Sequence, residues 1–490
     1  MCGIAGLLDK NLRPDQARHV GRAMLAAIRH RGPDSHGVWL DGSSGLLLGH
    51  ARLAIQDLSP SGHQPMHSAS GRYCVVFNGE IYNFLEIAEA LRQKGHAFTG
   101  RSDTEVMLTA IEEWGLEASL QRFTGMFAFA LWDKHDAVLY LVRDRMGEKP
   151  LYYGWQGPLF CFASELKAVR ACLQVRPEID IEALADYFRS GYVSAPLSIY
   201  KGIHKLPPGC ILSLPLAALV EKPIHSPERD NGGISPKSYW RVIDSLNAGL
   251  AKCFEDENEA VDALDSKLRE TIRCQMIADV KVGTFLSGGI DSSLVSAIAQ
   301  HVSDEKVCTY TIGFAEKEYD ESSYAERIAR HLGTDHLTMQ VTPADALDVV
   351  PSLSTIYDEP FADSSQIPAL LVSRLARQHV TVCLSGDGGD ELFAGYNRYI
   401  WADYLWRRLQ PVPFPLRKAA GHLLEMPSPA FWDGLYRTMS MLRGRSHSPS
   451  RLVGLKLQKL AGFMQQPDIQ RGYEYLLSYW HRPDELIRDR

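Results

Sequence analysis

The chain has 490 residues, 45% hydrophobic and 23% charged, a composition typical of a globular protein with two or more domains. A net charge of -7 argues against a nucleic-acid-binding surface, and no apolar run approaches the ~20 residues that a membrane-spanning helix needs. Nine cysteines without a CxxC pair, and an N-terminus without a signal-peptide pattern, favour a reduced cytoplasmic protein without a disulfide framework.

The first 165 residues predict an α+β domain that contains many short strands. Helices are expected at Gln16–His30 and Leu85–Lys94, where apolar residues recur at three and four positions. Apolar runs bounded by turn residues predict the strands Gly3–Leu8, Gly45–His50, Tyr73–Asn78, Phe127–Asp133 and Ala137–Arg143.

A change in composition marks the expected domain boundary. The stretch Leu206-Pro207-Pro208-Gly209 and the polar residues 221–237 are typical of a linker or surface loop. We therefore predict a first domain over residues 2–204, a linker with connecting strands over 205–245, and a second domain over 246–490.

In the second domain, strands and helices alternate after an amphipathic helix marked by Val261, Leu264, Leu268 and Ile272. This alternation predicts an α/β fold with a doubly wound, mostly parallel sheet. Strands are expected at Val280–Leu286, Thr309–Phe314, Leu337–Val341 and Val380–Leu384, and helices at Ser292–His301, Ser323–His331 and Ile367–Gln378. From Tyr396 the tail is expected to be helical, with a Pro-rich break at 410–416.

Cys2 directly follows the initiator methionine, and this position has a chemical consequence. Methionine aminopeptidase removes Met1 before a small residue, which leaves a thiol and a free α-amine on one carbon. Because an α-amine has a pKa near ~8, it can accept the thiol proton, as in other N-terminal nucleophiles. Position alone leaves a second interpretation open, in which Cys2 is a small buried residue that opens a strand.

The sharpest signal in the second domain is Leu286-Ser287-Gly288-Gly289-Ile290-Asp291-Ser292-Ser293, which follows an apolar strand and opens a helix. Glycines let the backbone approach a ligand, and the N–H groups at a helix start favour an anion. Hydroxyls and one carboxylate suit phosphate oxygens and Mg²⁺, whereas the lysine of a Walker loop is absent. An ordinary glycine-rich turn is the alternative, and the full string disfavours it.

A second loop, Ser385-Gly386-Asp387-Gly388-Gly389-Asp390-Glu391, follows another apolar strand. Its three carboxylates repel one another unless a cation or a basic ligand group joins them. Ligands of open α/β sheets bind beyond the carboxyl ends of the strands, so the two loops are expected to face one crevice.

Together with Cys2-Gly3-Ile4, these motifs resemble those of glutamine-dependent asparagine synthetases. The resemblance implies an Ntn-hydrolase-like αββα sandwich, followed by an ATP pyrophosphatase domain of the N type. The supporting strings are His30–Asp34, Arg52–Ile55, Gly62–Met66, Asn78–Asn83, Ser102–Glu105, Arg143–Arg145, Gly147 to Pro150, Tyr319–Glu321, Asp358–Ser365 and Ser385–Glu391.

The resemblance assigns roles in glutamine hydrolysis. Cys2 is expected to attack the side-chain amide, with Asn78 and Gly79 as the oxyanion hole. The remaining glutamine-binding residues that it implies are Arg52 for the substrate carboxylate, Asp103 and Glu80 for its α-ammonium, and Leu53 and Ile55 beside them.

For synthesis, the resemblance implies ATP and Mg²⁺ as cofactors and aspartate as the acceptor, and it is compatible with a homodimer. The metal ligands would be Asp291 and Asp390, and Asp387 would belong to the same acidic site. The ATP-binding residues that it implies are Leu286, Ser287, Gly288, Gly289, Asp291, Ser292, Ile312, Ser385 and Gly386.

The sequence departs from the family pattern near its C-terminus. After residues 475–480 it lacks the motifs that contain the family's catalytic lysine, so the second domain is expected to be C-terminally truncated and no lysine is assigned. Three alternatives stay open: a glutaminase that is impaired in synthesis, an amidotransferase with another carboxylate acceptor in an envelope or natural-product pathway, and a non-catalytic binding module.

Overall fold

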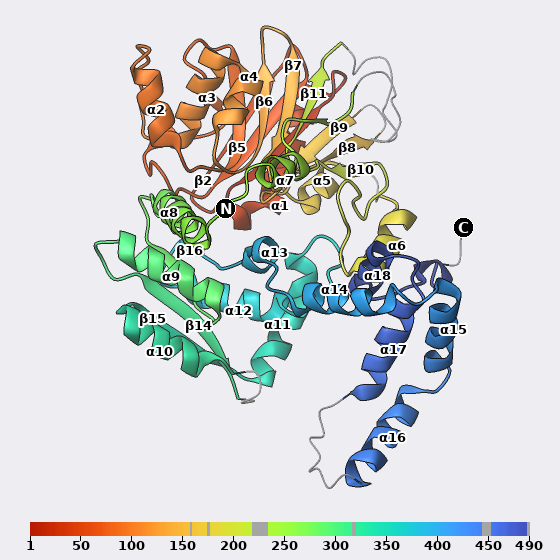
Figure 1. The fold of residues 1–490 in the computed structure, drawn as a ribbon. Coiled ribbons are helices and arrows are strands. Elements are labelled where there is room, and N and C mark those ends of the chain that lie inside the picture. The colour runs from red at the N-terminus through yellow and green to blue at the C-terminus, as the bar shows by residue number, and fades with distance from the viewer. Residues whose placement is uncertain (157–158, 174–176, 218–233, 316–319, 443–451, 488–490) are drawn as a thin grey trace. The chain divides into compact units, whose positions relative to one another are not determined.

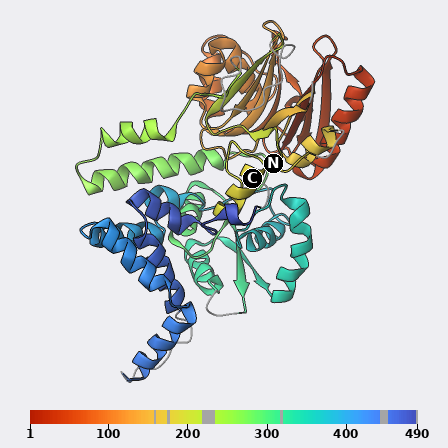
Figure 2. The same cartoon turned by 90° about the vertical axis from the view of Figure 1, so that its right-hand side faces the viewer.

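The computed structural model describes the chain except residues 157–158, 174–176, 218–233, 316–319, 443–451 and 488–490 (Figures 1 and 2). Most of the predicted polar loop 221–237, and Tyr319 of one motif, therefore lie outside the described residues. The chain divides into two compact units. Unit 1 comprises Met1–Tyr187 and Tyr192–Gly386, and unit 2 comprises Phe188–Gly191 and Asp387–Arg490.

Two antiparallel six-stranded sheets form the first part of unit 1. The first sheet has the order β10 (Ile203–Lys205), β8 (Tyr152–Gln156), β9 (Leu159–Ala163), β1 (Gly3–Leu8), β3 (Leu46–Arg52) and β2 (Ser35–Asp41). The second has the order β12 (Lys237–Ser238), β11 (Cys210–Pro215), β7 (Val138–Arg143), β6 (Gly125–Asp133), β5 (Tyr73–Ile81) and β4 (Met66–His67). β11 and β12, from the predicted linker region, thus add to the second sheet.

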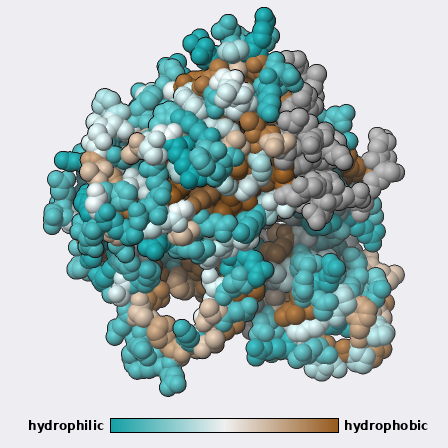
Figure 3. Space-filling view, turned by 90° about the horizontal axis from the view of Figure 1, so that it is seen from above, coloured by the Kyte–Doolittle hydropathy of each residue, from teal (hydrophilic) through white to brown (hydrophobic). Residues whose placement is uncertain are grey.

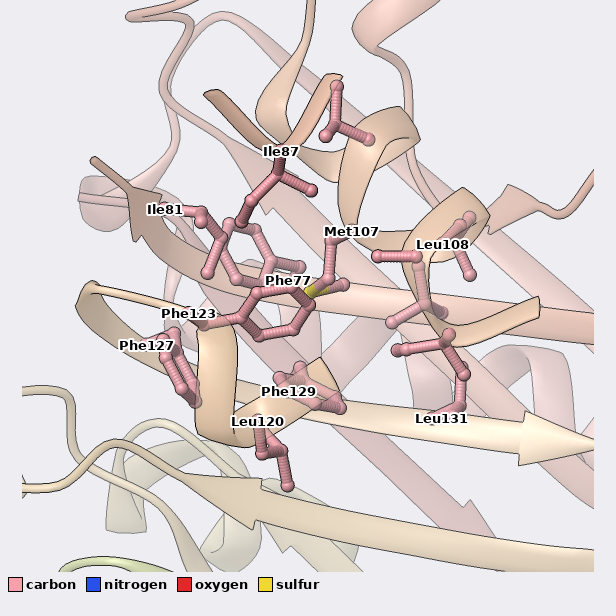
Figure 4. Packing of buried hydrophobic residues seen from close by; sticks show 14 of the residues in the cluster. Phe77, Ile81, Ile87, Met107, Leu108, Leu120, Phe123, Phe127, Phe129 and Leu131 are labelled. Carbon is pink, nitrogen blue, oxygen red and sulfur yellow. The ribbon is translucent and has the colours of Figure 1, made fainter. Parts of the chain in front are cut away.

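Helices cover the outer face of each sheet, which confirms the αββα sandwich. Along β5, Val75 and Phe77 pack against helices while Cys74 and Val76 face the other sheet, because successive strand residues point to opposite sides. Figure 4 shows Phe77 in the cluster on the helical side. The helices over the second sheet are α2 (Phe84–Arg92), α3 (Asp103–Trp114) and α4 (Leu116–Arg122). Those over the first are α1 (Pro14–Ala27), α5 (Leu166–Cys172) and α6 (Ile181–Ser190).

The prediction of only two helices in this region was wrong, and α3 shows why. Val106, Met107, Leu108, Ala110 and Ile111 are all buried, so no polar face gives the helix a clear periodicity. The first predicted helix was too long, because α1 ends at Ala27 and a separate 3-10 turn follows it.

A four-stranded parallel sheet forms the second part of unit 1. Its order is β15 (Asp335–Val341), β14 (Cys308–Phe314), β13 (Val282–Phe285) and β16 (Val382–Leu384). The chain moves from β13 to β14 and β15, and then returns to the other side of β13. The direction of winding therefore reverses between β13 and β16, where such sheets bind ligands.

Helices lie on both faces of this sheet, which confirms the doubly wound fold. Thr284 contacts Ser296 of α9 (Ile290–Val302), whereas the next residue, Phe285, packs on the opposite face near α12 (Gln366–Ala376). The other helices of this part are α7 (Val242–Leu250), α8 (Glu257–Gln275), α10 (Ser322–Leu332) and α11 (Pro343–Ile356). Sequence analysis missed α11, which contains Pro351, a residue that normally interrupts helices.

Unit 2 is helical, as predicted for the tail. The Pro-rich break is also confirmed, because one helix ends at Leu409 and the next begins at Phe414. Its helices are α13 (Gly389–Phe393), α14 (Asn397–Leu409), α15 (Phe414–Glu425), α16 (Pro429–Leu442), α17 (Val453–Met464) and α18 (Ile469–Leu477).

Among the described residues, no helix combines the length and apolar character needed to cross a bilayer. On the face that Figure 3 displays, hydrophilic side chains predominate and hydrophobic ones form smaller groups.

Phe129 tests the contribution of the helix-facing cluster to stability. Its ring is fully buried, 5.8 Å from the Phe127 ring centroid and 6.4 Å from that of Phe77. We expect Phe129→Ala to lower the free energy of unfolding of the sandwich by about 3–5 kcal/mol. Urea denaturation followed by tryptophan fluorescence measures this loss. Leu85→Ala, at a site that is 52% exposed, is the control, and an equal loss in both variants would contradict the assignment.

Candidate functional site

A pocket in the sandwich contains the predicted glutaminase residues. Its walls come from the N-terminus, the segment after β3, β5 and the start of α3. The lining residues are Met1, Cys2, Arg52, Leu53, Ile55, Gln56, Gly62, Gln64, Phe77, Asn78, Gly79, Glu80, Ser102, Asp103, Thr104, Met126 and Lys149. All seven residues predicted to bind glutamine, and Cys2, therefore lie around one pocket.

Cys2 immediately precedes β1, and three contacts fix it. The Leu53 N–H group donates to Cys2 Sγ at 3.4 Å, and the thiol lies 3.5 Å from the Leu53 carbonyl oxygen. Arg31 Nε donates to the Cys2 carbonyl at 2.8 Å. Burial raises the pKa of the Cys2 thiol, so the thiol needs a nearby base to become a nucleophile.

The α-amine beside Cys2 has the properties of such a base. In the chain with Met1 present, burial lowers the pKa of this amine to about 6, and the charges of Arg31 and Lys149 act in the same direction. An amine with this pKa is mostly unprotonated at neutral pH. Removal of Met1 would break the peptide bond to Cys2, and the nitrogen of Cys2 would then become the α-amine.

Asn78 is the last residue of the strand that the sequence predicts, and this strand is the first part of β5. The strand was expected to end at Asn78 but continues to Ile81, so Asn78, Gly79 and Glu80 are held in a regular ladder against β6. Asn78 is fully buried, and neither its Nδ2 nor its Oδ1 has a hydrogen-bond partner among the described residues. A buried amide without a partner is costly, and a ligand in the pocket could satisfy it.

Arg52 is buried at the end of β3, and backbone carbonyls orient it. Its Nη1 donates to the Ser59 carbonyl at 3.0 Å and its Nη2 to the Asp57 carbonyl. Asp57 is itself held by Asp279, whose carboxylate accepts the Asp57 N–H at 2.8 Å. A side chain at position 62 would collide with the guanidinium, which explains why glycine is needed there.

Two buried carboxylates give the pocket a negative end. Burial raises the pKa of Glu80 to about 7, and the nearby charge of Asp103 adds to the shift. Burial also raises the pKa of Asp103 to about 6, although its Oδ2 accepts the Ile81 N–H at 2.9 Å. Glu80 accepts no side-chain hydrogen bond from the described residues. An ammonium group bound here would favour the ionised form of both groups.

Several pocket residues had no predicted role, although their sequence strings were recognised. Gln64 accepts the Phe77 N–H at 2.6 Å and donates to Thr104 Oγ1 at 3.3 Å, which ties β5 to α3. Lys149 is buried, and its Nζ lies 2.6 Å from Met126 Sδ. The sequence around Gln64 and around Lys149 contains no pattern that would have predicted a role for either side chain.

The predicted nucleotide loop lies between β13 and α9. Gly288 has a φ of +87°, a left-handed conformation that suits glycine. The Ser292 hydroxyl accepts the Ser287 N–H at 3.1 Å and lies 2.9 Å from the Ser287 hydroxyl. No side chain caps the first turn of α9, so its N–H groups can receive an anion.

The loop after β16 approaches the nucleotide loop directly. A side chain at position 386 would lie 2.8 Å from the Ser292 nitrogen and 3.1 Å from Asp291 Cβ. Ser385 and Gly386 are therefore neighbours of Asp291, as expected for loops at the reversal point. Asp387 and Asp390 belong to unit 2 and are not located relative to Asp291.

The structure does not bring the Leu286 and Ile312 side chains together. Leu286 packs against Ala325 and Ala329 of α10, whereas Ile312 packs with Val341 and its cluster on the other face of the sheet.

The oxygen atoms of side chains at the point where the winding of the parallel sheet reverses are suitable ligands for Mg²⁺. The described residues contain no cluster of three or more His, Cys, Asp or Glu side chains able to hold a metal ion. Mg²⁺ in nucleotide sites is usually bound by one or two carboxylates together with phosphate oxygens, so Asp291 of the predicted nucleotide loop fits this pattern.

Comparisons with known proteins identify both parts. A family model described as a glutamine amidotransferase domain matches residues 1–223, and one described as asparagine synthase matches residues 263–489. Asparagine synthetase [glutamine-hydrolyzing] 1 of Bacillus subtilis (strain 168) is 35% identical over 457 residues, covering 93% of this chain and 67% of that protein.

Two further relatives give the same result. A protein of Methanocaldococcus jannaschii with a provisional name as a glutamine-hydrolysing asparagine synthetase is 35% identical over 419 residues, 82% of this chain and 76% of its own length. Asparagine synthetase [glutamine-hydrolyzing] 3 of Bacillus subtilis (strain 168) is 31% identical over 420 residues, 82% of this chain and 64% of that protein. With Cys2 in a pocket of one part and a glycine-rich loop that opens a helix in the other, the chain belongs to the glutamine-hydrolysing asparagine synthetases, ATP-dependent ligases that take nitrogen from glutamine.

Proposed function

We propose that this chain makes asparagine from aspartate, ATP and ammonia released from glutamine, through an aspartyl-AMP intermediate. The observation that supports it most is the pocket in which Cys2, the unpartnered amide of Asn78, Arg52 and two buried carboxylates converge. This set provides a nucleophile, a hydrogen-bond donor, and groups of both charges for an amino acid.

In the proposed glutaminase reaction, the Cys2 α-amine takes the thiol proton after Met1 has been removed. The thiolate attacks the side-chain amide carbon of glutamine, and Asn78 Nδ2 with the Gly79 N–H stabilises the oxyanion. The α-amine then gives that proton to the amide nitrogen, so that collapse of the intermediate expels ammonia and leaves a glutamyl thioester, which water hydrolyses to glutamate. Arg52 would bind the substrate carboxylate, and Glu80 and Asp103 its ammonium group.

In the proposed synthetase reaction, the loops at the β13 and β16 ends bind ATP. An oxygen of the aspartate β-carboxylate attacks the α-phosphorus and expels pyrophosphate, and ammonia then displaces AMP from the acyl carbon. The N–H groups of α9 and the hydroxyls of Ser287 and Ser292 would bind phosphate oxygens. Mg²⁺ held by Asp291 would neutralise phosphate charge.

Substitution of the nucleophile separates the two reactions. We expect wild-type protein to form asparagine and AMP from glutamine, aspartate and ATP, and Cys2→Ala to form them only from ammonium salts. Glutamate, asparagine and AMP are quantified by chromatography, and Cys253→Ala, at an exposed cysteine, is the matched control. Glutamine turnover by Cys2→Ala would contradict the nucleophile, and absent AMP with every nitrogen source would contradict synthesis. Pyrophosphate release with another acid but not aspartate would favour a different acceptor.

The buried carboxylates predict that glutamine binding weakens in acid. Because the pKa of Glu80 is raised to about 7 and that of Asp103 to about 6, both carboxylates gain protons as pH falls through this range and lose their attraction for an ammonium group. We expect the Kd for glutamine to rise about tenfold or more between pH 7.5 and 5.5. Calorimetry on Cys2→Ala protein avoids turnover. A flat profile, or an unchanged profile after Glu80→Gln, would contradict this role.

Gly386 tests the nucleotide site separately. A methyl group at this position would press on the Ser292 nitrogen and the Asp291 side chain. We expect Gly386→Ala to lower kcat/KM for ATP in AMP formation by at least about tenfold, because small displacements at reacting groups are costly. Glutamine hydrolysis should stay within twofold of wild type. Gly434→Ala, where a methyl group meets nothing within 4 Å, is the control.

A further inference from the structure

Glu165 links Arg31 to a lysine in the sandwich. It lies between β9 and α5, and its Oε1 accepts hydrogen bonds from Arg31 Nη1 at 2.8 Å and His30 Nε2 at 3.1 Å. Its other oxygen, Oε2, accepts from Lys167 Nζ at 2.6 Å. Because Arg31 Nε also donates to the Cys2 carbonyl, Glu165 connects Lys167 to the backbone of the nucleophile.

Lys167 makes its other contacts with the connection between α11 and α12. Its Nζ lies 3.1 Å from Asp358 Oδ1 and donates to the Ile356 carbonyl at 3.3 Å. Its backbone N–H donates to Asp358 Oδ2 at 3.1 Å. One ammonium group therefore bridges a carboxylate of the sandwich and a carboxylate of the parallel-sheet part, within unit 1.

The next residue anchors the same connection a second time. Glu359 Oε1 accepts the Ile199 N–H at 2.8 Å, and its Oε2 accepts from Tyr152 Oη at 3.1 Å and forms an ion pair with Lys205 Nζ at 2.5 Å. The side chains of Asp358 and Glu359 are each 11% exposed. The sandwich therefore holds the adjacent carboxylates of Asp358 and Glu359 through hydrogen bonds and ion pairs, and both side chains are mostly buried.

The series of charges is continuous and largely shielded from solvent. The side chains of Arg31, Glu165, Lys167 and Asp358 are 8%, 13%, 20% and 11% exposed, and their charges alternate in sign. Although burial opposes ionisation, hydrogen bonds from His30, Arg31 and Lys167 lower the pKa of Glu165 to about 2, so it stays ionised. Removal of one member leaves its neighbours buried and incompletely paired.

The anchored connection leads to the predicted nucleotide site. Residues 357–365 enter α12, and α12 leads to β16 and then to Ser385 and Gly386 beside Asp291. Because a crossover helix runs back against a parallel strand, the start of α12 lies toward the carboxyl edge where the nucleotide loop is found. A shift of this edge on substrate binding would be transmitted to Asp358.

We propose that Lys167 is a positioning residue that couples the two active sites. It ties Asp358, through Glu165 and Arg31, to the carbonyl of Cys2, so that occupancy of the synthetase site alters the placement of the nucleophile. This inference rests on the proposed function, because it requires a synthetase reaction to which glutamine hydrolysis responds. The physical basis is the Lys167 ammonium group, which pairs with Glu165 of the sandwich and with Asp358 of the parallel-sheet part.

The test compares the response of glutamine hydrolysis to synthetase substrates. In wild-type protein, we expect ATP with aspartate to change kcat/KM for glutamate release by about fivefold or more. Lys167→Met keeps most of the aliphatic stem and removes the charge, so we expect this response to fall below twofold and the ratio of glutamate to AMP to rise. Ammonia-dependent AMP formation should persist.

Controls separate coupling from folding. Lys201→Met removes a lysine that is 71% exposed and paired with Glu178, and it should respond like wild type. Asp358→Asn keeps the side-chain size and an acceptor for the Lys167 N–H, so it should lose the response even if Lys167→Met is unstable. A full response in either variant, or none in wild-type protein that makes AMP, overturns the coupling. Wild-type protein that makes no AMP instead contradicts the proposed function.

Discussion

The antiparallel pairing of β1 with β3 is the constraint on which the pocket around Cys2 depends. Chain ends usually fray, yet here Gly3 pairs with Ala51, so Cys2 is brought beside Arg52 and Leu53. The proposed nucleophile and the proposed carboxylate-binding residue are thus placed by one ladder of backbone hydrogen bonds. Arg31 then fixes the Cys2 carbonyl from the side, and the buried charges behind it connect this small region to a loop more than 300 residues later.

The pocket is electrostatically unfavourable when it holds no ammonium group. A carboxyl group whose pKa is raised on folding is less costly when protonated, so Glu80 and Asp103 lower the stability of the folded chain above the pKa values they have when unfolded. That cost is largest above pH 7 and is relieved as pH falls through about 7 and 6. Binding sites often retain such strain, because groups arranged for a ligand are poorly satisfied without it.

Apolar patterns predicted most of the fold but only part of the site. Gly3–Leu8 was predicted with correct bounds because every residue of that strand is buried. The extension of β5 to Ile81 was missed, since Gly79 and Glu80 interrupt the apolar run and only tertiary pairing with β6 makes them part of a strand. Motifs indicated which residues gather in the pocket. The contact of Lys167 with Asp358, 191 residues apart, has no local signature and emerges only in the folded chain.

The place of β11 limits how the protein can be divided. This strand, Cys210–Pro215, pairs with β7 over five residues, although it follows the predicted end of the first domain at residue 204. A fragment cut at residue 204 would leave one edge of β7 with unpaired backbone groups, and such edges recruit strands from other molecules. A fragment that continues past Pro215 retains its own edge strand. The edge of β7 is therefore covered only when the fragment includes the eleven residues 205–215 beyond its predicted boundary.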